Sequence, residues 1–249
     1  MTTTTDIPVA QFQDEGWCVV RNLIPRDVVA AVQQRVTEIV QETPDWPTGH
    51  FQYVDPAKYP RPDGGPQPGA LQTPAKQEAV FAAMADHPAL QAAMAGLLGG
   101  PVVRHTDQVG IKLGRITEEQ GGRSYYHQDS FYWKLPPERG CNVWIPLQDV
   151  GPQAICLAVM PGSQRGWQLI EHESYFDNPA WGSWRDGAYT PFKRHRIPAS
   201  VVGDAAGEVV VPMGPGDALF FGTYTWHRSE PNRSGADKAF YAIAYRREE

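Results

Sequence analysis

The hydrophobic pattern of the chain changes near residue 100. Before that point apolar residues recur at helical spacing, and the clearest set follows Pro25 and comprises Val28, Val29, Val32, Val36 and Val40. Residues 12–20 predict a short helix that ends at Gly16, followed by a short strand. Residues 75–98 predict an alanine-rich helix with a break near Pro88. The first part of the chain is therefore expected to be helical.

After residue 101 the pattern is typical of short strands. Runs of β-branched and aromatic residues separated by glycine and proline cover residues 102–104, 108–113, 124–133, 142–147, 155–160, 208–211, 218–221, 226–229 and 239–245. We expect the last two runs to form a hairpin across residues 232–235. Helices followed by seven or eight strands predict a mainly β barrel or sandwich, with the helices packed on one side.

Two stretches lack a regular period. Residues 41–74 contain eight prolines and four glycines, which predicts an irregular surface connection, with a pocket lid as the alternative. Residues 165–207 form a long polar and aromatic insertion. Its five acidic and five basic residues balance, so we expect no net field that would steer a charged ligand. The whole chain, 1–249, is predicted to be one domain, with a helical part to about residue 100 and a β core from about 101 to 249.

Composition excludes several classes of partner. The net charge of −6 and the pI near 5.6 argue against nucleic acid and anionic membranes, because no basic face would offset phosphate repulsion. No apolar run approaches the ~20 residues that span a bilayer, and the threonine-rich start does not resemble a signal peptide. Three cysteines without CxxC spacing indicate a reducing compartment. We therefore expect a cytoplasmic protein that acts on a small molecule, as a monomer or homodimer.

The candidate chemistry begins with a His and an Asp two residues apart. His127 and Asp129 lie in the aromatic run 124–133, and alternate residues of a strand point to the same face, about 6–7 Å apart along the chain. One imidazole and one carboxylate are two of the three ligands of the facial triad that holds non-haem Fe(II). His227 follows the strand at 218–221 and is the best third ligand, with His105 as its rival. Without a second histidine, the pair would be an ordinary polar pair.

Several motifs in order carry a family resemblance. They are His127-x-Asp129, a gap of about a hundred residues, Gly-Asp-Ala at 216–218, and His-x-Ser-x-Pro-Asn-x-Ser at 227–234. Together with the opening helix, strand and helix and the segment 156–163, these motifs resemble the phytanoyl-CoA dioxygenase family over most of the chain. The resemblance implies a double-stranded β-helix (jelly roll, cupin-like) and an Fe(II)/2-oxoglutarate-dependent dioxygenase.

The resemblance also implies roles for individual residues. The iron ligands would be His127, Asp129 and His227. Residues expected to bind 2-oxoglutarate are Ser229, Trp144, Gln108 and Lys238, the last of which stands where family members usually have an arginine eleven residues after the distal histidine. If Lys238 is merely exposed, the carboxylate would need Arg104, Arg115 or Arg246. Phe131 and Trp133 are candidate substrate contacts, with core packing as the alternative.

The implied reaction uses Fe(II), 2-oxoglutarate and O₂, with ascorbate as a candidate stimulant. It would hydroxylate an unactivated C–H of a small, largely apolar or ring-bearing molecule while 2-oxoglutarate is decarboxylated to succinate and CO₂. Desaturation, epimerisation, cyclisation and peroxide formation are alternative outcomes in the same family. A dioxygenase that does not use 2-oxoglutarate and a catalytically silent barrel are the other hypotheses. The presence of Asp129 argues against a halogenase, because no ligand position is left vacant for halide.

Overall fold

The computed structural model describes residues 6–47, 49–116, 123–176 and 181–248, so the threonine-rich start lies outside it. The helices are α1 (Val9–Glu15), α2 (Arg26–Gln41), α3 (Ala79–Ala85), α4 (Pro88–Leu98), α5 (Ser130–Trp133) and α6 (Ala199–Val202), with 3-10 turns at Pro74–Lys76 and Arg165–Trp167. The strands are β1 (Trp17–Val20), β2 (Phe51–Val54), β3 (Pro68–Gln72), β4 (Val102–Lys112), β5 (Ser124–His127), β6 (Gly140–Pro146), β7 (Leu157–Val159), β8 (Glu173–Tyr175), β9 (Trp181–Arg185), β10 (Ala188–Pro191), β11 (Arg194–Arg196), β12 (Val209–Val211), β13 (Ala218–Gly222), β14 (His227–Ser229) and β15 (Lys238–Arg247).

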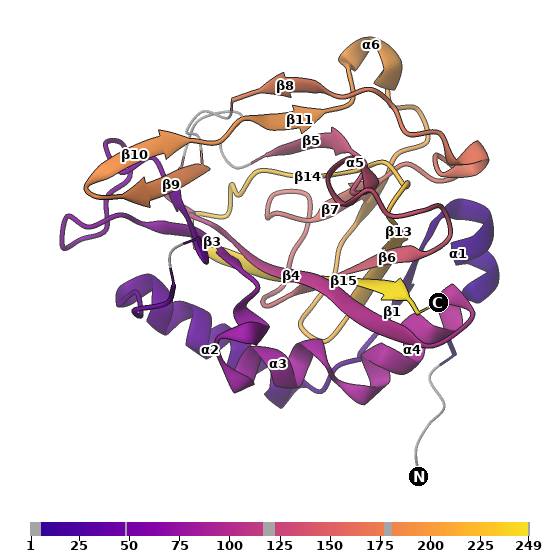
Figure 1. The fold of residues 1–249 in the computed structure, drawn as a ribbon, viewed down its shortest axis with the longest axis horizontal. Coiled ribbons are helices and arrows are strands. Elements are labelled where there is room, and N and C mark those ends of the chain that lie inside the picture. The colour runs from indigo at the N-terminus through magenta and orange to yellow at the C-terminus, as the bar shows by residue number, and fades with distance from the viewer. Residues whose placement is uncertain (1–5, 48, 117–122, 177–180, 249) are drawn as a thin grey trace.

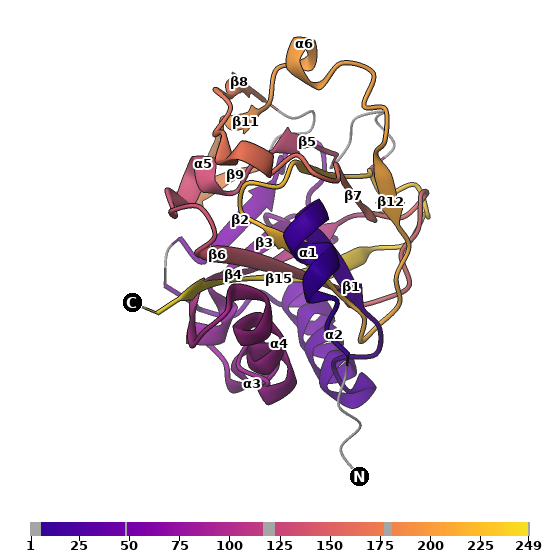
Figure 2. The same ribbon diagram turned by 90° about the vertical axis from the view of Figure 1, so that its right-hand side faces the viewer.

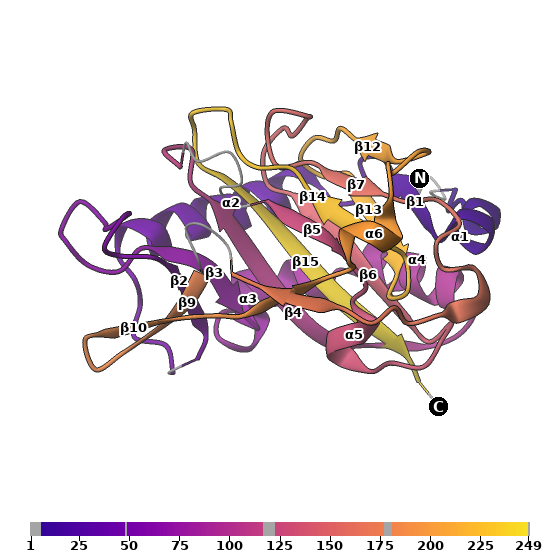
Figure 3. The same ribbon diagram turned by 90° about the horizontal axis from the view of Figure 1, so that it is seen from above.

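Two antiparallel sheets face each other (Figures 1 and 3). The large sheet has nine strands in the order β1-β13-β6-β15-β4-β3-β2-β9-β10, and the small sheet has four in the order β12-β7-β14-β5. The chain passes repeatedly between them, since β4, β6, β13 and β15 belong to the large sheet and β5, β7, β12 and β14 to the small one. This is the double-stranded β-helix that the family resemblance implied.

The N-terminal helices cover the outer face of the large sheet. Figure 2 shows α2, α3 and α4 packed below β4, β6 and β15. Their apolar faces bury Val29, Val32, Val36, Ile39, Phe81, Met84, Leu90 and Met94 against the sheet residues Val109, Tyr241 and Ile243. The valine pattern after Pro25 therefore faces the core as predicted, and the inner face of the sheet is left for the site. None of the described helices is both long enough and apolar enough to cross a membrane.

Two predicted features were wrong. Residues 41–74 are not wholly irregular, because β2 and β3 join the large sheet and pair with β4 and β9, which are distant in sequence. The expected hairpin at 232–235 does not form either. β14 pairs with β5 and β7, whereas β15 pairs with β4 and β6, so the segment between them crosses from one sheet to the other.

The insertion at 165–207 contributes to two places. β9 and β10 form a hairpin at the edge of the large sheet, where β9 pairs with β2. β8 and β11 form a separate ribbon that lies above β5 in Figure 1. The insertion therefore borders the space between the two sheets from more than one side.

Gly110 has no side chain, and this leaves room for the ring of Phe240, a residue of the cavity lining. A Cβ at Gly110 of β4 would lie 2.2 Å from Cζ of Phe240, whose ring stacks on Trp144 at 5.1 Å. We expect Gly110→Ala to displace both rings and lower the free energy of unfolding by about 1–3 kcal/mol. Gly96→Ala is the control, because an added Cβ at this exposed position of α4 meets open space and should raise this free energy by up to about 1 kcal/mol. Urea denaturation measures both, and equal stability of the two variants would contradict this packing.

Candidate metal centre

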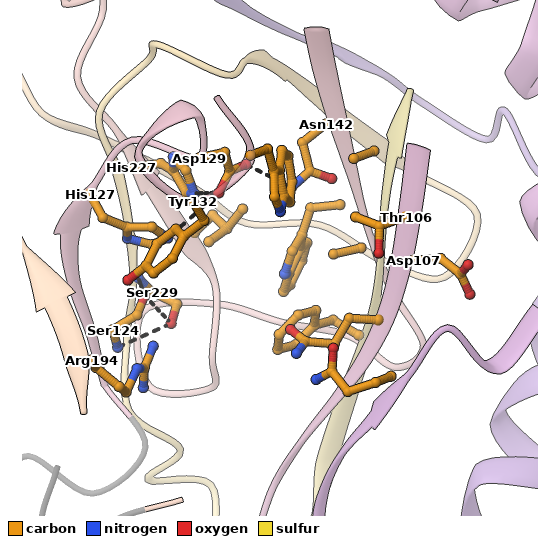
Figure 4. Close-up of a pocket in the computed structure, with 18 of the residues that line it drawn as sticks. Thr106, Asp107, Ser124, His127, Asp129, Tyr132, Asn142, Arg194, His227 and Ser229 are labelled. Carbon is orange, nitrogen blue, oxygen red and sulfur yellow. Dashed lines mark hydrogen bonds and ion pairs between the residues drawn. The ribbon is translucent and has the colours of Figure 1, made fainter. Parts of the chain in front are cut away.

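Three potential ligands converge between the ends of two neighbouring strands (Figure 4). His127 is the last residue of β5, and His227, the first residue of β14, pairs with it across the small sheet. Asp129 follows two residues after His127. One ligand atom from each side chain lies within 4.8 Å of the ligand atoms of the other two. Among the described residues, these three form the group of His, Cys, Asp or Glu side chains that could hold a metal ion.

The local path differs from the predicted strand at 124–133. β5 ends at His127, and Asp129 already has helical backbone angles, φ −63° and ψ −32°, as the residue before α5. The strand therefore turns into a helix between the two ligands. The predicted convergence of His127 and Asp129 is nevertheless present, because this turn brings the carboxylate back beside the imidazole.

Backbone carbonyls set the tautomer of both histidines. Nδ1 of His127 lies 2.8 Å from the carbonyl oxygen of Tyr125, and Nδ1 of His227 lies 3.0 Å from that of Thr225. A carbonyl only accepts, so each Nδ1 carries the hydrogen and each Nε2 presents a lone pair. The two Nε2 atoms lie 3.8 Å (His127) and 3.6 Å (His227) from Oδ1 of Asp129.

Burial keeps both imidazoles neutral. Burial and then the neighbouring His227 lower the pKa of His127 to about 3, and the charge of Arg194 contributes a smaller decrease. Burial lowers the pKa of His227 to about 4. Both rings can therefore donate Nε2 to a cation at neutral pH. Burial also raises the pKa of Asp129, an effect that a bound cation opposes.

Asn142 orients the carboxylate from the opposite sheet. Its Nδ2 donates to Oδ2 of Asp129 at 2.9 Å, so Oδ1 is the oxygen that faces the two imidazoles. Asn142 lies on β6 and is 6% exposed. No sequence motif pointed to Asn142, although it lies two positions before Trp144, on the same face of a strand that was predicted.

The donor set fits Fe(II). Two imidazole nitrogens and one carboxylate oxygen on one side, with the other side open to a cavity, are the facial arrangement of non-haem iron oxygenases. Ligand atoms bound at about 2.0–2.2 Å to one ion on cis positions lie roughly 3 Å apart. The separations of 3.6 and 3.8 Å thus require only a small inward movement.

Gln128, between the two ligands, connects the centre to the insertion. Its Nε2 donates to the carbonyls of Gln168 and Tyr224, both at 2.9 Å, and its Oε1 accepts from the backbone N–H of Ile170 at 2.8 Å. Its own backbone N–H donates to Nε2 of His172 at 3.1 Å. Gln128 is fully buried, so this residue fixes the start of the insertion to the metal-binding turn.

The triad opens into a cavity of about 500 Å³ between the two sheets (Figure 4). Among the described residues its lining includes Gln52, Gln72, Thr106, Gln108, Lys112, Ser124, Tyr132, Trp133, Asn142, Trp144, Trp181, Phe192, Lys193, Arg194, Ser229 and Phe240. Four residues predicted to bind cosubstrate or substrate therefore line this cavity, namely Gln108, Trp133, Trp144 and Ser229.

Phe131 lies elsewhere. Its ring stacks on His172 at a centroid distance of 4.3 Å and packs against His195 at 5.0 Å, and it is not among the lining residues. The prediction assumed a strand, in which Phe131 and Trp133 would share a face. In α5 successive side chains turn by about 100°, so two residues apart they point in different directions.

The buried cation of the cavity is Lys112, which the sequence analysis did not select. Its Nζ donates to Oγ of Ser229 at 2.6 Å and to the carbonyl of Glu230 at 2.8 Å, and the residue is 5% exposed. Lys238 is the cross-strand partner of Lys112 on β15 and β4. The ammonium group of Lys112 occupies the buried place beside Ser229, so that of Lys238 must lie elsewhere. Nζ of Lys238 instead donates to the carbonyl of Asp149 at 3.2 Å, outside the cavity lining. The sequence did contain a signal for this buried cation, because Lys112 is a charged residue inside the apolar run 109–113.

The alternative arginine anchors lie away from the cavity. Arg104 binds the carboxylates of Asp86 and Asp107, and Arg115 donates to the carbonyl of Pro60 at 2.8 Å. Neither these two arginines nor Arg246 is among the lining residues.

Some buried polar atoms lack a partner within the described part of the chain. They include Nε1 of Trp144, Oδ1 of Asn142 and Nε2 of Gln72, all from residues that line the cavity. Buried polar groups are nearly always hydrogen-bonded, so such atoms indicate a polar ligand. An indole N–H in the cavity that contains the triad suits a carboxylate-bearing cosubstrate.

Comparisons with known proteins agree in family and fold. The family model described as "Phytanoyl-CoA dioxygenase (PhyH)" matches residues 12–240. A curated protein of Caenorhabditis elegans, "Probable phytanoyl-CoA dioxygenase", is 24% identical over 232 residues, which cover 90% of this chain and 69% of that protein.

Two solved structures show the same fold. AviO1 from Streptomyces viridochromogenes Tue57 is 20% identical with a TM-score of 0.69, over 98% of this chain and 96% of that one. EctD from S. alaskensis, solved with 2-oxoglutarate and 5-hydroxyectoine, is 18% identical with a TM-score of 0.70, over 96% of this chain and 74% of that one.

The role of Asn142 can be tested without catalysis. We expect Asn142→Ala to weaken Mn(II) binding by about 10- to 100-fold, because the carboxylate of Asp129 loses the donor that orients it. The electron paramagnetic resonance signal of free Mn(II) measures this affinity. His227→Ala should abolish tight binding, and His105→Ala, which alters an exposed histidine outside the triad, should leave it unchanged. Wild-type affinity in Asn142→Ala would contradict the role given to Asn142.

Proposed function

The chain belongs to the phytanoyl-CoA dioxygenase family and is an iron- and 2-oxoglutarate-dependent oxygenase, and we propose that it hydroxylates an unactivated C–H of a small, ring-bearing molecule. In this reaction 2-oxoglutarate is decarboxylated to succinate and CO₂. The observation that carries the proposal is one cavity that holds both the His-Asp-His triad and the buried Lys112–Ser229 pair. The first fits the metal and the second fits the far carboxylate of the cosubstrate.

Iron would be held by Nε2 of His127, Nε2 of His227 and Oδ1 of Asp129. When bound with 2-oxoglutarate and O₂, it supplies the oxidative decarboxylation that drives C–H oxidation. The residues of this chain keep the three donors fixed. The carbonyls of Tyr125 and Thr225 hold the imidazoles, and Asn142 holds the carboxylate.

The far carboxylate of 2-oxoglutarate would bind Lys112 and Ser229. An ammonium acts as a point charge without the fork of a guanidinium, so a neighbouring hydroxyl adds direction. Ser124 positions that hydroxyl, since its Oγ lies 2.9 Å from Oγ of Ser229 and accepts from the backbone N–H of Ser229 at 2.8 Å. Trp144 would offer its indole N–H, and Gln108 would contribute to the same wall of the cavity. We propose Lys112 in place of Lys238 as the anchor.

The substrate would lie between aromatic walls. The Phe, Tyr and Trp residues of the lining are Tyr132, Trp133, Trp144, Trp181, Phe192, Phe221 and Phe240, and a cavity of about 500 Å³ suits a single small molecule. The glutamines Gln52, Gln72 and Gln108 add polar groups to the same lining. The walls therefore favour a ring with polar substituents over a purely apolar chain.

The cysteines favour a reducing compartment. Cys18, Cys141 and Cys156 are free and buried. Burial raises the pKa of Cys18 to about 12 and of Cys156 to about 11, so both remain protonated and unreactive at neutral pH. We infer that the protein functions in the cytoplasm.

Cofactor binding gives the first test of the proposed function. Under anaerobic conditions, Fe(II) and 2-oxoglutarate added together should produce a weak visible charge-transfer band, and admitting O₂ should yield succinate. Asp129→Ala should lose both, because one of the three ligands is removed. A wild-type protein that binds Fe(II) but shows neither the band nor succinate would favour a dioxygenase that does not use 2-oxoglutarate, or a silent barrel.

The choice of anchor gives the second test. We expect Lys112→Met to raise the 2-oxoglutarate concentration for half-maximal succinate formation by about tenfold or more, because a charge-assisted hydrogen bond is lost. Mn(II) affinity should be retained. Lys238→Met removes the cross-strand partner lysine outside the cavity and should leave the requirement near wild type. The reverse result would assign the anchor to Lys238.

A further inference from the structure

Residues 192–197 form a segment beside the cavity that is fastened at both ends. The backbone N–H of Phe192 donates to the carbonyl of Trp181 at 2.7 Å, which ties the segment to β9. The backbone N–H of Ile197 donates to the carbonyl of Tyr126 at 2.7 Å, which ties it to β5, the strand that carries His127. The side chains of this segment therefore have a fixed position relative to the triad.

Arg194 points from this segment into the cavity. Phe192, Lys193 and Arg194 all line the cavity. The guanidinium carbon of Arg194 lies 5.8 Å from the ring centroid of Trp181 and 5.9 Å from that of Tyr175. Figure 4 shows Arg194 beside Ser124 and Ser229, on the same side of the cavity as His127. These cation–π contacts restrict the position of the guanidinium.

Arg196, two residues later, has a different role. Its Nε donates to Oε1 of Glu173 at 2.7 Å, and its guanidinium lies over Tyr125 at 4.7 Å. It is not among the described lining residues of the cavity. The pair of β8 and β11 thus uses one arginine to hold its own two strands together and presents the other to the cavity.

Cations outnumber carboxylates among the described residues that line the cavity. Among the described lining residues the carboxylates are Asp107 and Asp129, and Asp129 belongs to the metal centre. Oδ1 of Asp107 accepts from Arg104 at 2.8 Å, and its Oδ2 accepts from Tyr241 at 2.9 Å, so this carboxylate is already engaged. The cations are Lys112, Lys193 and Arg194, of which Lys112 is assigned to the cosubstrate.

We propose that the primary substrate carries an oxyanion, a carboxylate or a phosphate, which Arg194 binds while Lys193 adds positive charge to the same lining. A guanidinium has five N–H donors in a fork that matches an oxyanion, so Arg194 can serve this group in addition to partners within the protein. The oxyanion at Arg194 and the ring between the aromatic walls together place one part of the substrate near the triad. This inference rests on the proposed function, because it takes the cavity to be the substrate site.

The equal number of acids and bases in residues 165–207 predicted no net field. Among the described residues of this segment, Glu173 is bound to Arg196 on the ribbon, while Arg194 and Lys193 border the cavity. A count over the segment does not show where the charged side chains point.

A matched pair of ring-bearing probes tests the oxyanion site. Phenylacetate and phenylacetamide have the same ring and nearly the same shape, and only the first carries a charge. With Mn(II) at the triad and saturating 2-oxoglutarate, paramagnetic relaxation of the ring protons reports binding inside the cavity. We expect the wild-type protein to bind the acid about tenfold more tightly than the amide. No preference for the acid would overturn the proposal.

Variants assign the preference to Arg194. Arg194→Gln should abolish it, and Arg194→Lys, which keeps the charge but not the fork, should retain part of it. Arg185→Gln is the control, because it removes one positive charge from an exposed position of β9 outside the cavity lining. An undiminished preference in Arg194→Gln would overturn the proposal. A raised 2-oxoglutarate requirement in that variant would overturn it as well, because Arg194 would then hold the cosubstrate.

The same samples separate this inference from the proposed function. Paramagnetic relaxation of the 2-oxoglutarate protons reports whether the cosubstrate binds at the metal. Loss of that signal in the wild-type protein would contradict the proposed function itself. A normal 2-oxoglutarate signal together with equal binding of acid and amide would leave the oxygenase assignment intact and refute the oxyanion site alone.

Discussion

The structure depends on holding three polar ligand atoms together in a space enclosed by two apolar sheets. Isolated, His127, Asp129 and His227 would each lose hydration without compensation, and here each has a specific hydrogen-bonded partner. Two of those partners are backbone carbonyls two residues before a histidine, so the strand geometry itself sets which nitrogen faces the centre. The third is Asn142 on the opposite sheet. The metal centre is therefore coupled to the spacing between the sheets. A cation would bind to ligands whose desolvation is already compensated by hydrogen bonds within the fold.

A second constraint follows from the turn between the ligands His127 and Asp129, at the end of β5. Gln128 uses both ends of its amide to fasten the insertion to this turn, and residues 192–197 are fastened to the neighbouring strand at Tyr126. The insertion thus borders the cavity at positions defined by the metal-binding residues. In physical terms the substrate side of the cavity and its metal side are one hydrogen-bonded unit, which allows Arg194 to be placed accurately relative to the triad.

Much of the fold could be predicted because the valines of α2 and the alternating runs after residue 101 report which faces are buried. The triad could be predicted because its residue types are chemically unusual and occur in a family pattern. The strands inside the proline-rich stretch could not, since besides pairing with each other they depend on β4 and β9, which lie further along the chain. The sequence likewise pointed to Lys238 as the lysine of the cavity, whereas the buried lysine there is Lys112. Two lysines that are 126 positions apart become cross-strand partners, and only the three-dimensional register shows which one is buried.

The most direct test of the central claim is to count the nitrogen ligands of a bound metal. Pulsed electron paramagnetic resonance of the Mn(II)-loaded protein in the presence of 2-oxoglutarate detects each coordinated imidazole through its nitrogen coupling. We predict two coupled histidines in the wild-type protein and one in His227→Gln. A wild-type spectrum with no coupled histidine, or one that is unchanged by His227→Gln, would contradict a metal centre built from these three side chains.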